Sequence, residues 1–174
     1  MRPLLLGSRR RGNLLGVLLC AAMLAFAFYS QYMLHLEPCP LCMFQRVAVV
    51  GVGIAFLAAA LHDPAAMGAR IYGVLIAAIA LVGIGVAIRH VWIQAQPPGT
   101  VAACGAGLSY MMQVLPITEV IAKVLKGSGE CSKVDWTFLG LSMPWWVLIA
   151  LSLLALWAVI VNFSAGLIRP NPDR

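Results

Sequence analysis

The chain has 174 residues, of which 62% are hydrophobic and 10% charged, and its mean hydropathy is +0.93. Soluble globular domains carry about 25% charged residues, so this composition excludes a soluble protein and indicates one membrane domain over residues 1–174. The net charge of +6 is a signal of membrane orientation, and no nucleic-acid partner is expected.

Apolar segments follow one another along the chain. Leu14–Met33, Val47–Leu61 and Ile71–Ile88 are uncharged over 20, 15 and 18 residues, and Trp145–Phe163 is the most apolar part of the C-terminal region. A spanning helix needs about 20 residues, so the second one must begin earlier, near Cys42. We therefore expect an all-α membrane protein: a four-transmembrane-helix bundle with spans at about 14–33, 43–61, 71–89 and 144–163.

Basic residues indicate the orientation of this bundle. Four spans place both termini and the middle loop on one side, and that side holds seven of the twelve basic residues: Arg2, Arg9, Arg10, Arg11, Arg70, Arg169 and Arg174. Short loops rich in Lys and Arg stay in the cytoplasm. The N- and C-termini are therefore expected to be cytoplasmic, and loops 34–42 and 90–143 to be periplasmic, with the long loop joining helices 3 and 4.

Cysteines are concentrated on the expected external side. Cys39 and Cys42 fall in the first external loop, and Cys104 and Cys131 fall in the second. External compartments are where disulfides persist. Cys20 lies inside the first span and is expected to be a small buried hydrophobic residue.

Cys39-Pro40-Leu41-Cys42 is a C-x-x-C motif at the start of the second span. A disulfide between such neighbours closes a very small ring and stabilises the fold little, so the motif favours redox chemistry over a structural bond. Cys42 is expected in the first helical turn, where the helix dipole favours a thiolate.

Zinc is the main alternative for four cysteines. Structural zinc sites usually join two C-x-x-C knuckles, whereas Cys104 and Cys131 stand alone, with no nearby histidine to complete a knuckle. No metal site is therefore expected.

Arg46 and His90 are candidate neighbours of the motif. Arg46 follows Cys42 by four residues and shares its helix face, where it either extends to lipid headgroups or stabilises negative charge on the thiol and on a bound acceptor. His90, at the external end of the third span, is either a proton donor or an interfacial residue.

Leu108–Lys126 places apolar residues at roughly helical spacing, with an interruption at Pro116. This segment is either a helix lying in the membrane interface or a helix packed on a small core formed by the loop.

The chain resembles the DsbB family of bacterial inner-membrane disulfide bond formation proteins over nearly its full length. The resemblance is carried by Pro38-Cys39-Pro40-Leu41-Cys42 with Arg46, by isolated Cys104, and by Gly129-Glu130-Cys131 leading into Trp136-Thr137-Phe138-Leu139-Gly140-Leu141-Ser142-Met143-Pro144-Trp145. The family often has an acidic residue before the arginine, where this chain has Gln45.

The resemblance implies a multi-pass enzyme of the bacterial inner membrane. It would reoxidise a periplasmic DsbA-like thiol oxidase and pass the electrons to membrane quinone (ubiquinone or menaquinone). Cys104 would accept the partner thiolate with Cys131 as its bonded mate, while Cys39 and Cys42 would form the membrane-side pair. Cys42 would then lie beside the quinone, with Arg46 supporting it. His90, from its place in the sequence, is a further candidate for quinone binding.

Two alternatives remain open from the sequence. One is a paralogue that serves a dedicated substrate oxidase with the same cysteines. The other is a non-enzymatic membrane scaffold or metal-binding subunit with structural cysteines. The strongly oxidising potential of DsbA-type partners, near −120 mV, favours the quinone pathway because it requires a still stronger terminal acceptor.

Overall fold

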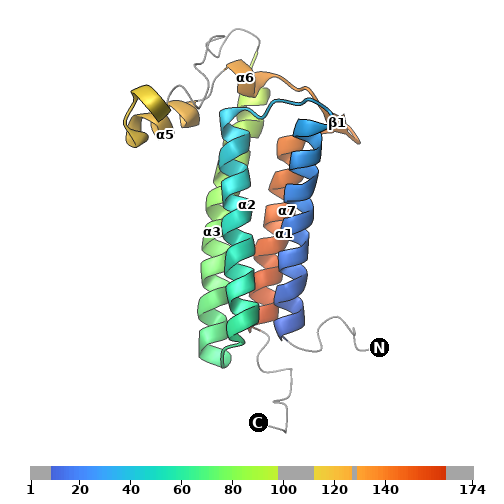
Figure 1. Ribbon diagram of the computed structural model, residues 1–174, viewed down its shortest axis with the longest axis vertical. Coiled ribbons are helices and arrows are strands. Elements are labelled where there is room, and N and C mark those ends of the chain that lie inside the picture. The colour runs from blue at the N-terminus through green and yellow to red at the C-terminus, as the bar shows by residue number, and fades with distance from the viewer. Residues whose placement is uncertain (1–8, 98–111, 127–128, 164–174) are drawn as a thin grey trace.

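A computed structural model describes residues 9–97, 112–126 and 129–163. Within these residues, four helices are long and apolar enough to cross a membrane: α1 (Arg9–Tyr32), α2 (Pro40–His62), α3 (Ala66–Gln94) and α7 (Met143–Phe163). They lie side by side in one bundle (Figure 1). The predicted all-α, four-helix membrane protein is confirmed.

Helix α2 begins at Pro40, and the residues at its start explain why. Cys39 is the N-cap in extended conformation, and Pro40 occupies the first turn, where its fixed φ angle favours a helix and its missing N–H is not needed. The early start gives α2 its 23 residues and resolves the shortness of the apolar run. Asp63 ends the helix in the left-handed conformation, and α3 starts three residues later.

The bundle core is built from small and branched apolar residues. Phe56, Ile76 and Leu151 are fully buried in it. Glycines let the helices approach closely, since a Cβ on Gly16 would lie 2.8 Å from the Phe56 ring and one on Gly83 would lie 2.8 Å from Ala48 and Leu151. Close approach at small residues is how helices associate in membranes. Cys20 is 2% exposed in this core, as expected.

A buried amide pair joins α1 to α7. Asn13 Nδ2 donates to Asn162 Oδ1 at 3.3 Å, and Asn162 Nδ2 donates to Asn13 Oδ1 at 3.1 Å. Nearby, Trp157 Nε1 donates to the Gly12 carbonyl at 3.0 Å. Interhelical bonds of this kind are worth about 0.6–2 kcal/mol each in membranes, so the pair fixes the register of two helices.

We expect Asn13→Ala to lower the free energy of unfolding in detergent by about 1–2 kcal/mol, because it leaves the buried Asn162 Oδ1 without the donor from Asn13. Asn162→Ala should cost a similar amount, and the double variant should cost clearly less than the sum. Ser152→Ala is the matched control, since the Ser152 hydroxyl is exposed and bonds only within its own helix, to the Leu148 carbonyl. Additive losses would show that the two amides do not interact.

One end of the bundle carries all the smaller elements, and we call it the cysteine end. It holds α5 (Ile117–Lys126), α6 (Gly129–Ser132) and a hairpin of β1 (Thr137–Phe138) paired antiparallel with β2 (Leu141–Ser142) (Figure 1). Gly140 has φ +78° and Leu139 has φ +52° at the hairpin turn.

The expected helix over Leu108–Lys126 is found in part, because α5 begins just after Pro116; residues 108–111 lie outside the described part of the chain. Val120 and Val124 of α5 are buried against Leu41 and Ile93 of the bundle. The helix thus packs on the bundle itself and not on a separate core formed by the loop.

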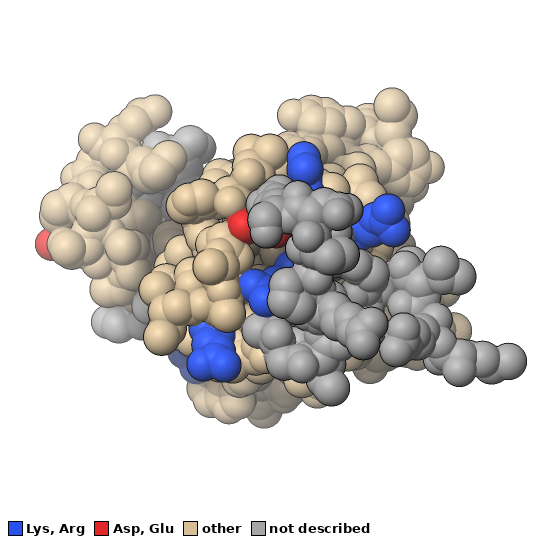
Figure 2. All heavy atoms as spheres, turned by 90° about the horizontal axis from the view of Figure 1, so that it is seen from below, with Lys and Arg blue, Asp and Glu red and all other residues tan. Residues whose placement is uncertain are grey.

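The opposite end of the bundle is basic. Arg9, Arg10 and Arg11 open α1, and Arg70 lies in the second turn of α3. Figure 2 shows this end, with Lys and Arg side chains at several places on it. Arg9 Nη1 also donates to the Pro64 carbonyl at 3.3 Å, which ties α1 to the turn between α2 and α3.

Candidate redox site

The C-x-x-C motif forms a dithiol at the N-terminus of α2. Cys39 Sγ and Cys42 Sγ lie 3.1 Å apart as thiols, and the backbone N–H of Cys42 donates to Cys39 Sγ at 3.4 Å. Cys39 is 8% exposed and Cys42 is half-buried. The N-cap therefore brings both sulfurs to the helix end whose dipole favours negative charge, as expected.

His90 reaches the same sulfur from α3. Its Nε2 lies 3.6 Å from Cys39 Sγ, and its Nδ1 lies 3.3 Å from the Gln45 amide nitrogen. Both His90 and Gln45 are nearly fully buried, at 2% and 3% exposed. Helix α3 continues past residue 89, where the span was expected to end, to Gln94. His90 therefore stands within the helix and not in a loop.

Arg46 turns toward α1. Its guanidinium donates to Gln31 Oε1 and, at 3.0 Å, to the Ala27 carbonyl, and it lies 5.5 Å from the centre of the Phe28 ring. These contacts hold the partly buried side chain against α1, whereas the lipid-headgroup alternative would leave it extended outward. No hydrogen bond between Arg46 and Cys42 is found within the described residues.

Cys131 lies much closer to the C-x-x-C motif than its position in the sequence indicates. It is fully buried on α6, in one apolar cluster with Cys39, Leu41 and Ile93. Cys104 lies outside the described residues, so its pairing with Cys131 stays a prediction.

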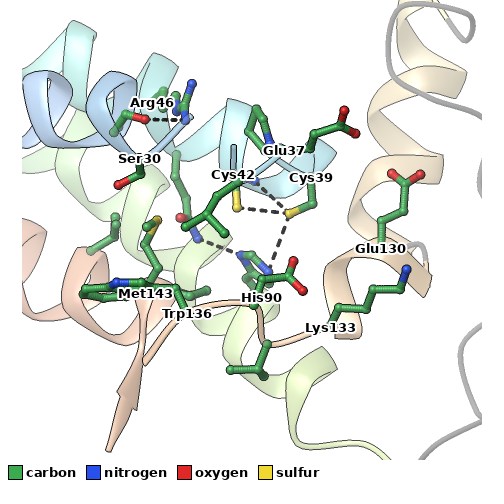
Figure 3. A pocket seen from close by; sticks show the side chains of 18 of the residues that line it. Ser30, Glu37, Cys39, Cys42, Arg46, His90, Glu130, Lys133, Trp136 and Met143 are labelled. Atoms are coloured by element: carbon green, nitrogen blue, oxygen red, sulfur yellow. Dashed lines mark hydrogen bonds between the residues drawn. The ribbon is translucent and has the colours of Figure 1, made fainter. Parts of the chain in front are cut away.

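A cavity of about 110 Å³ brings these groups together. Cys39, Cys42, Arg46 and His90 all line it. Figure 3 shows Cys39, Cys42 and His90 close together, with Trp136 below and with Arg46 set apart from them. Glu37, Glu130 and Lys133 stand around its outer side. All the described site residues predicted from the sequence except Cys131 therefore share one cavity.

A second, larger cavity of about 850 Å³ lies along α1 and α7. It is lined almost entirely by apolar side chains, among them Leu19, Leu153 and Trp157. Packing between α1 and α7 is sparse compared with that between α3 and α7 or between α1 and α2, which leaves this groove open along the bundle.

The two cavities are neighbours and share part of their lining. Five residues line both of them: Met23, Ala27, Trp136, Met143 and Val147. An aromatic chain caps the junction, because Trp136 packs edge-on to Phe26 at 5.6 Å and stacks on Phe138 at 6.1 Å. The hairpin, which carries Phe138 and directly follows Trp136, is fixed to α3 by the Ser142 hydroxyl, which donates to Gln94 Oε1 at 2.6 Å.

Two residues of the site, Gln31 and Trp136, were missed in the sequence, and Gln45 was noted only as a departure from the family pattern. Gln31 and Gln45 are polar residues within apolar helices, a pattern that signals a buried polar role in a membrane. Trp136 falls in the segment that carried the family resemblance, but nothing in its local pattern indicates a cavity wall.

Comparison with known proteins gives the family. The family model described as Disulfide bond formation protein DsbB matches residues 9–161. The chain belongs to the DsbB family. A Disulfide bond formation protein B of Methylococcus capsulatus is 52% identical over 158 residues, covering 87% of this chain and 96% of the relative. A second, from Nitrosococcus oceani, is 49% identical over 146 residues, covering 82% of this chain and 86% of the relative. A third, from Xanthomonas oryzae, is 49% identical over 159 residues, covering 91% of this chain and 92% of the relative.

Membership of the DsbB family agrees with the geometry. The protein is a multi-pass membrane protein with a disulfide oxidoreductase role in disulfide bond formation. A dithiol at a helix N-terminus, with an imidazole 3.6 Å from one sulfur, has the groups needed to exchange electrons as thiolates and to move the accompanying proton.

Proposed function

We propose that the protein reoxidises a periplasmic DsbA-like thiol oxidase and passes the electrons through two cysteine pairs to a membrane quinone. One observation carries the quinone part: the cavity that contains the Cys39–Cys42 dithiol shares its wall with an apolar groove running along α1 and α7. A quinone has a polar ring and a long apolar tail, and the two cavities match these two parts.

The residues at the cavity fit a quinone ring chemically. A quinone carries two carbonyl oxygens that need hydrogen-bond donors, and Arg46 and His90 both line the cavity with N–H groups. When bound, the quinone accepts two electrons and two protons. Trp136 and Met143 offer flat or flexible apolar contact of the kind that ligand pockets use around few polar groups.

Each side chain would have a separate task. Cys42 is the thiolate that faces the cavity and gives up the electrons. Arg46, held by Gln31 and the Ala27 carbonyl, places a fixed positive charge at the junction of cavity and groove. His90 lies against Cys39 and takes the proton of the Cys39 thiol as the Cys39–Cys42 disulfide forms.

Electrons would reach this pair across the cluster that holds Cys131 and Cys39. One thiolate of the partner dithiol attacks Cys104, which forms a mixed disulfide and releases the Cys131 thiolate. The second partner thiolate then attacks the mixed disulfide, which leaves the partner oxidised and Cys104 as a thiolate. Cys131 packs in the same buried cluster as Cys39, so thiol–disulfide exchange between the two pairs needs only a local shift of α6.

A substitution at the junction tests the quinone path. Ala27→Leu adds bulk where cavity and groove meet while keeping the carbonyl that binds Arg46, and we expect the apparent KM for quinone to rise roughly tenfold, because overfilling a packed site costs about 1–3 kcal/mol. Ala78→Leu, on an exposed face of α3, is the matched control. Quinone titrations at a fixed partner concentration measure both. An unchanged KM in Ala27→Leu would mean that quinone does not enter between α1 and α7.

We further propose the bacterial inner membrane as location, with both chain ends in the cytoplasm. The basic end of the bundle (Figure 2) and the positive-inside rule support it, and the cysteine end would face the oxidising periplasm. Alkaline phosphatase fused after Gly107 should then be active, and fused after Pro64 inactive. The reverse pattern would place the cysteines in a reducing compartment and contradict the proposed function.

A further inference from the structure

The three groups nearest one another in the redox site are two thiols and an imidazole. Cys39 Sγ lies 3.1 Å from Cys42 Sγ and 3.6 Å from His90 Nε2, and the three atoms all lie within 4.8 Å of one another. From the sequence no metal is expected, because only one cysteine pair has C-x-x-C spacing and no histidine stands near Cys104 or Cys131. The fold brings a histidine to the C-x-x-C pair itself: His90 of α3, 51 residues along the chain from Cys39.

We propose that the reduced Cys39–Cys42 pair and His90 form a binding site for Zn²⁺, and that the bound ion holds the pair out of the redox cycle. Thiolate and imidazole are the ligands that zinc favours. The site exists only in the dithiol form, because the disulfide offers no thiolate.

The distances fit tetrahedral zinc. With Zn–S near 2.3 Å and Zn–N near 2.0–2.1 Å, ligand atoms in a tetrahedron lie about 3.6 Å apart for S and N and about 3.8 Å apart for two sulfurs. The pair of Cys39 Sγ and His90 Nε2 is already at 3.6 Å. The two sulfurs, at 3.1 Å, need to separate by roughly 0.7 Å, which small side-chain rotations at the helix N-terminus allow.

Gln45 supports His90 from the side away from the thiols. Gln45, 3% exposed, has its amide 3.3 Å from His90 Nδ1. When Nε2 binds a metal, Nδ1 keeps its proton and needs an acceptor, and the Gln45 amide can turn its oxygen to it, since the amide presents both a donor and an acceptor. The fourth position faces the 110 Å³ cavity, which has room for water, so the arrangement is that of an open zinc site.

Zinc binding and inhibition of turnover by zinc rest on different grounds. Binding displaces two protons: Zn²⁺ plus two thiols and a neutral imidazole gives the bis-thiolate complex and two H⁺. This part depends on the geometry alone. Inhibition rests on the proposed function, because thiolates held by zinc cannot give electrons to an acceptor.

Cobalt(II) measures binding directly through its thiolate charge-transfer absorption. The full-length protein in detergent would carry Cys20→Ser, Cys104→Ser and Cys131→Ser, so that only the C-x-x-C thiols remain, and would be reduced and kept anaerobic. We expect one cobalt per chain, displaced by zinc, and no binding once Cys39 and Cys42 are oxidised to a disulfide. Equal binding by the oxidised form would overturn the site.

Variants separate His90 from other ligands. His90→Ala should lower the affinity at least tenfold, whereas His62→Ala, at the other end of α2, should leave it unchanged. Gln45→Leu should lower it about 10- to 100-fold through loss of the supporting hydrogen bond, and Gln45→Glu should retain it by accepting from Nδ1. Unchanged affinity in both His90→Ala and Gln45→Leu would overturn the proposal.

Zinc inhibition is then read in the wild-type protein. Stoichiometric Zn²⁺ should stop quinone reduction by the reduced protein, and EDTA should restore it. Tight cobalt binding without zinc inhibition would overturn the inhibitory role. If the metal-free protein failed to reduce quinone, the proposed function would fall and the inhibitory role with it, while the cobalt titration would still decide the metal site.

Discussion

Cys104→Ser is expected to abolish oxidation of the periplasmic partner, a loss of at least a hundredfold, while quinone reduction driven by small dithiols survives. The physical reason is that Cys104 is the proposed target of the partner thiolate, whereas a small dithiol can reach the Cys39–Cys42 pair in its own cavity. Both rates are measured on the purified protein, one with a reduced DsbA-like protein and one with dithiothreitol.

Companion variants sharpen this result. Cys131→Ser mixed with the oxidised partner should accumulate a mixed disulfide, because the Cys104 thiolate attacks the partner disulfide and Cys131, the thiol that would displace the partner from Cys104, is gone. The product can be identified on non-reducing gels. Cys20→Ser is the control, since Cys20 is buried in the bundle core away from both pairs. Loss of both activities together in Cys104→Ser would indicate that the four cysteines form one structural or metal site.

Arg46→Ala is expected to raise the apparent KM for quinone by about ten- to hundredfold, with activity partly restored at saturating quinone. Hydrogen bonds from a charged group contribute about 1.5–3 kcal/mol, and each 1.4 kcal/mol is a factor of ten in affinity. Quinone titrations at a fixed partner concentration give the separate effects on KM and kcat.

Arg46→Lys keeps the charge but loses the planar guanidinium that binds Gln31 and the Ala27 carbonyl together, so an intermediate KM is expected. Arg89→Ala is the matched control: Arg89 also stands near the cysteine end, but its guanidinium lies over the Trp92 ring at 4.2 Å, and it does not line the cavity. If Arg46→Ala and Arg89→Ala had equal KM values for quinone, Arg46 would not bind the quinone, and the quinone site would have to be sought nearer His90.

The helices could be predicted from the sequence because hydropathy depends on composition alone. Where each helix begins and ends depends on local chemistry. Pro40 and the Cys39 cap place the start of α2, whereas the hydropathy pattern breaks off at Arg89 although α3 continues to Gln94. Cys39, Cys42 and Arg46 could be grouped because their spacing on one helix makes them neighbours.

Contacts between helices could not be predicted. Hydropathy does not say which helices are adjacent, so the meeting of His90 with Cys39 and the sparse packing between α1 and α7 appear only in the fold. For the same reason the sequence could not show that Cys131, in a different loop, belongs to the same buried cluster as Cys39. The roles of Gln31 and Gln45 also could not be predicted, because their hydrogen-bond partners, Arg46 and His90, lie on other helices.

Anaerobic mixing of the fully reduced, purified protein with ubiquinone tests the central claim most directly. In the absence of any partner, the Cys104→Ser/Cys131→Ser form should reduce one quinone per chain and end with Cys39 and Cys42 as a disulfide, measured by quinone absorbance and by thiol counting. Cys42→Ser in the same form should reduce none. Loss of thiols without quinone reduction, or equal reduction by Cys42→Ser, would contradict transfer of electrons from this pair to quinone.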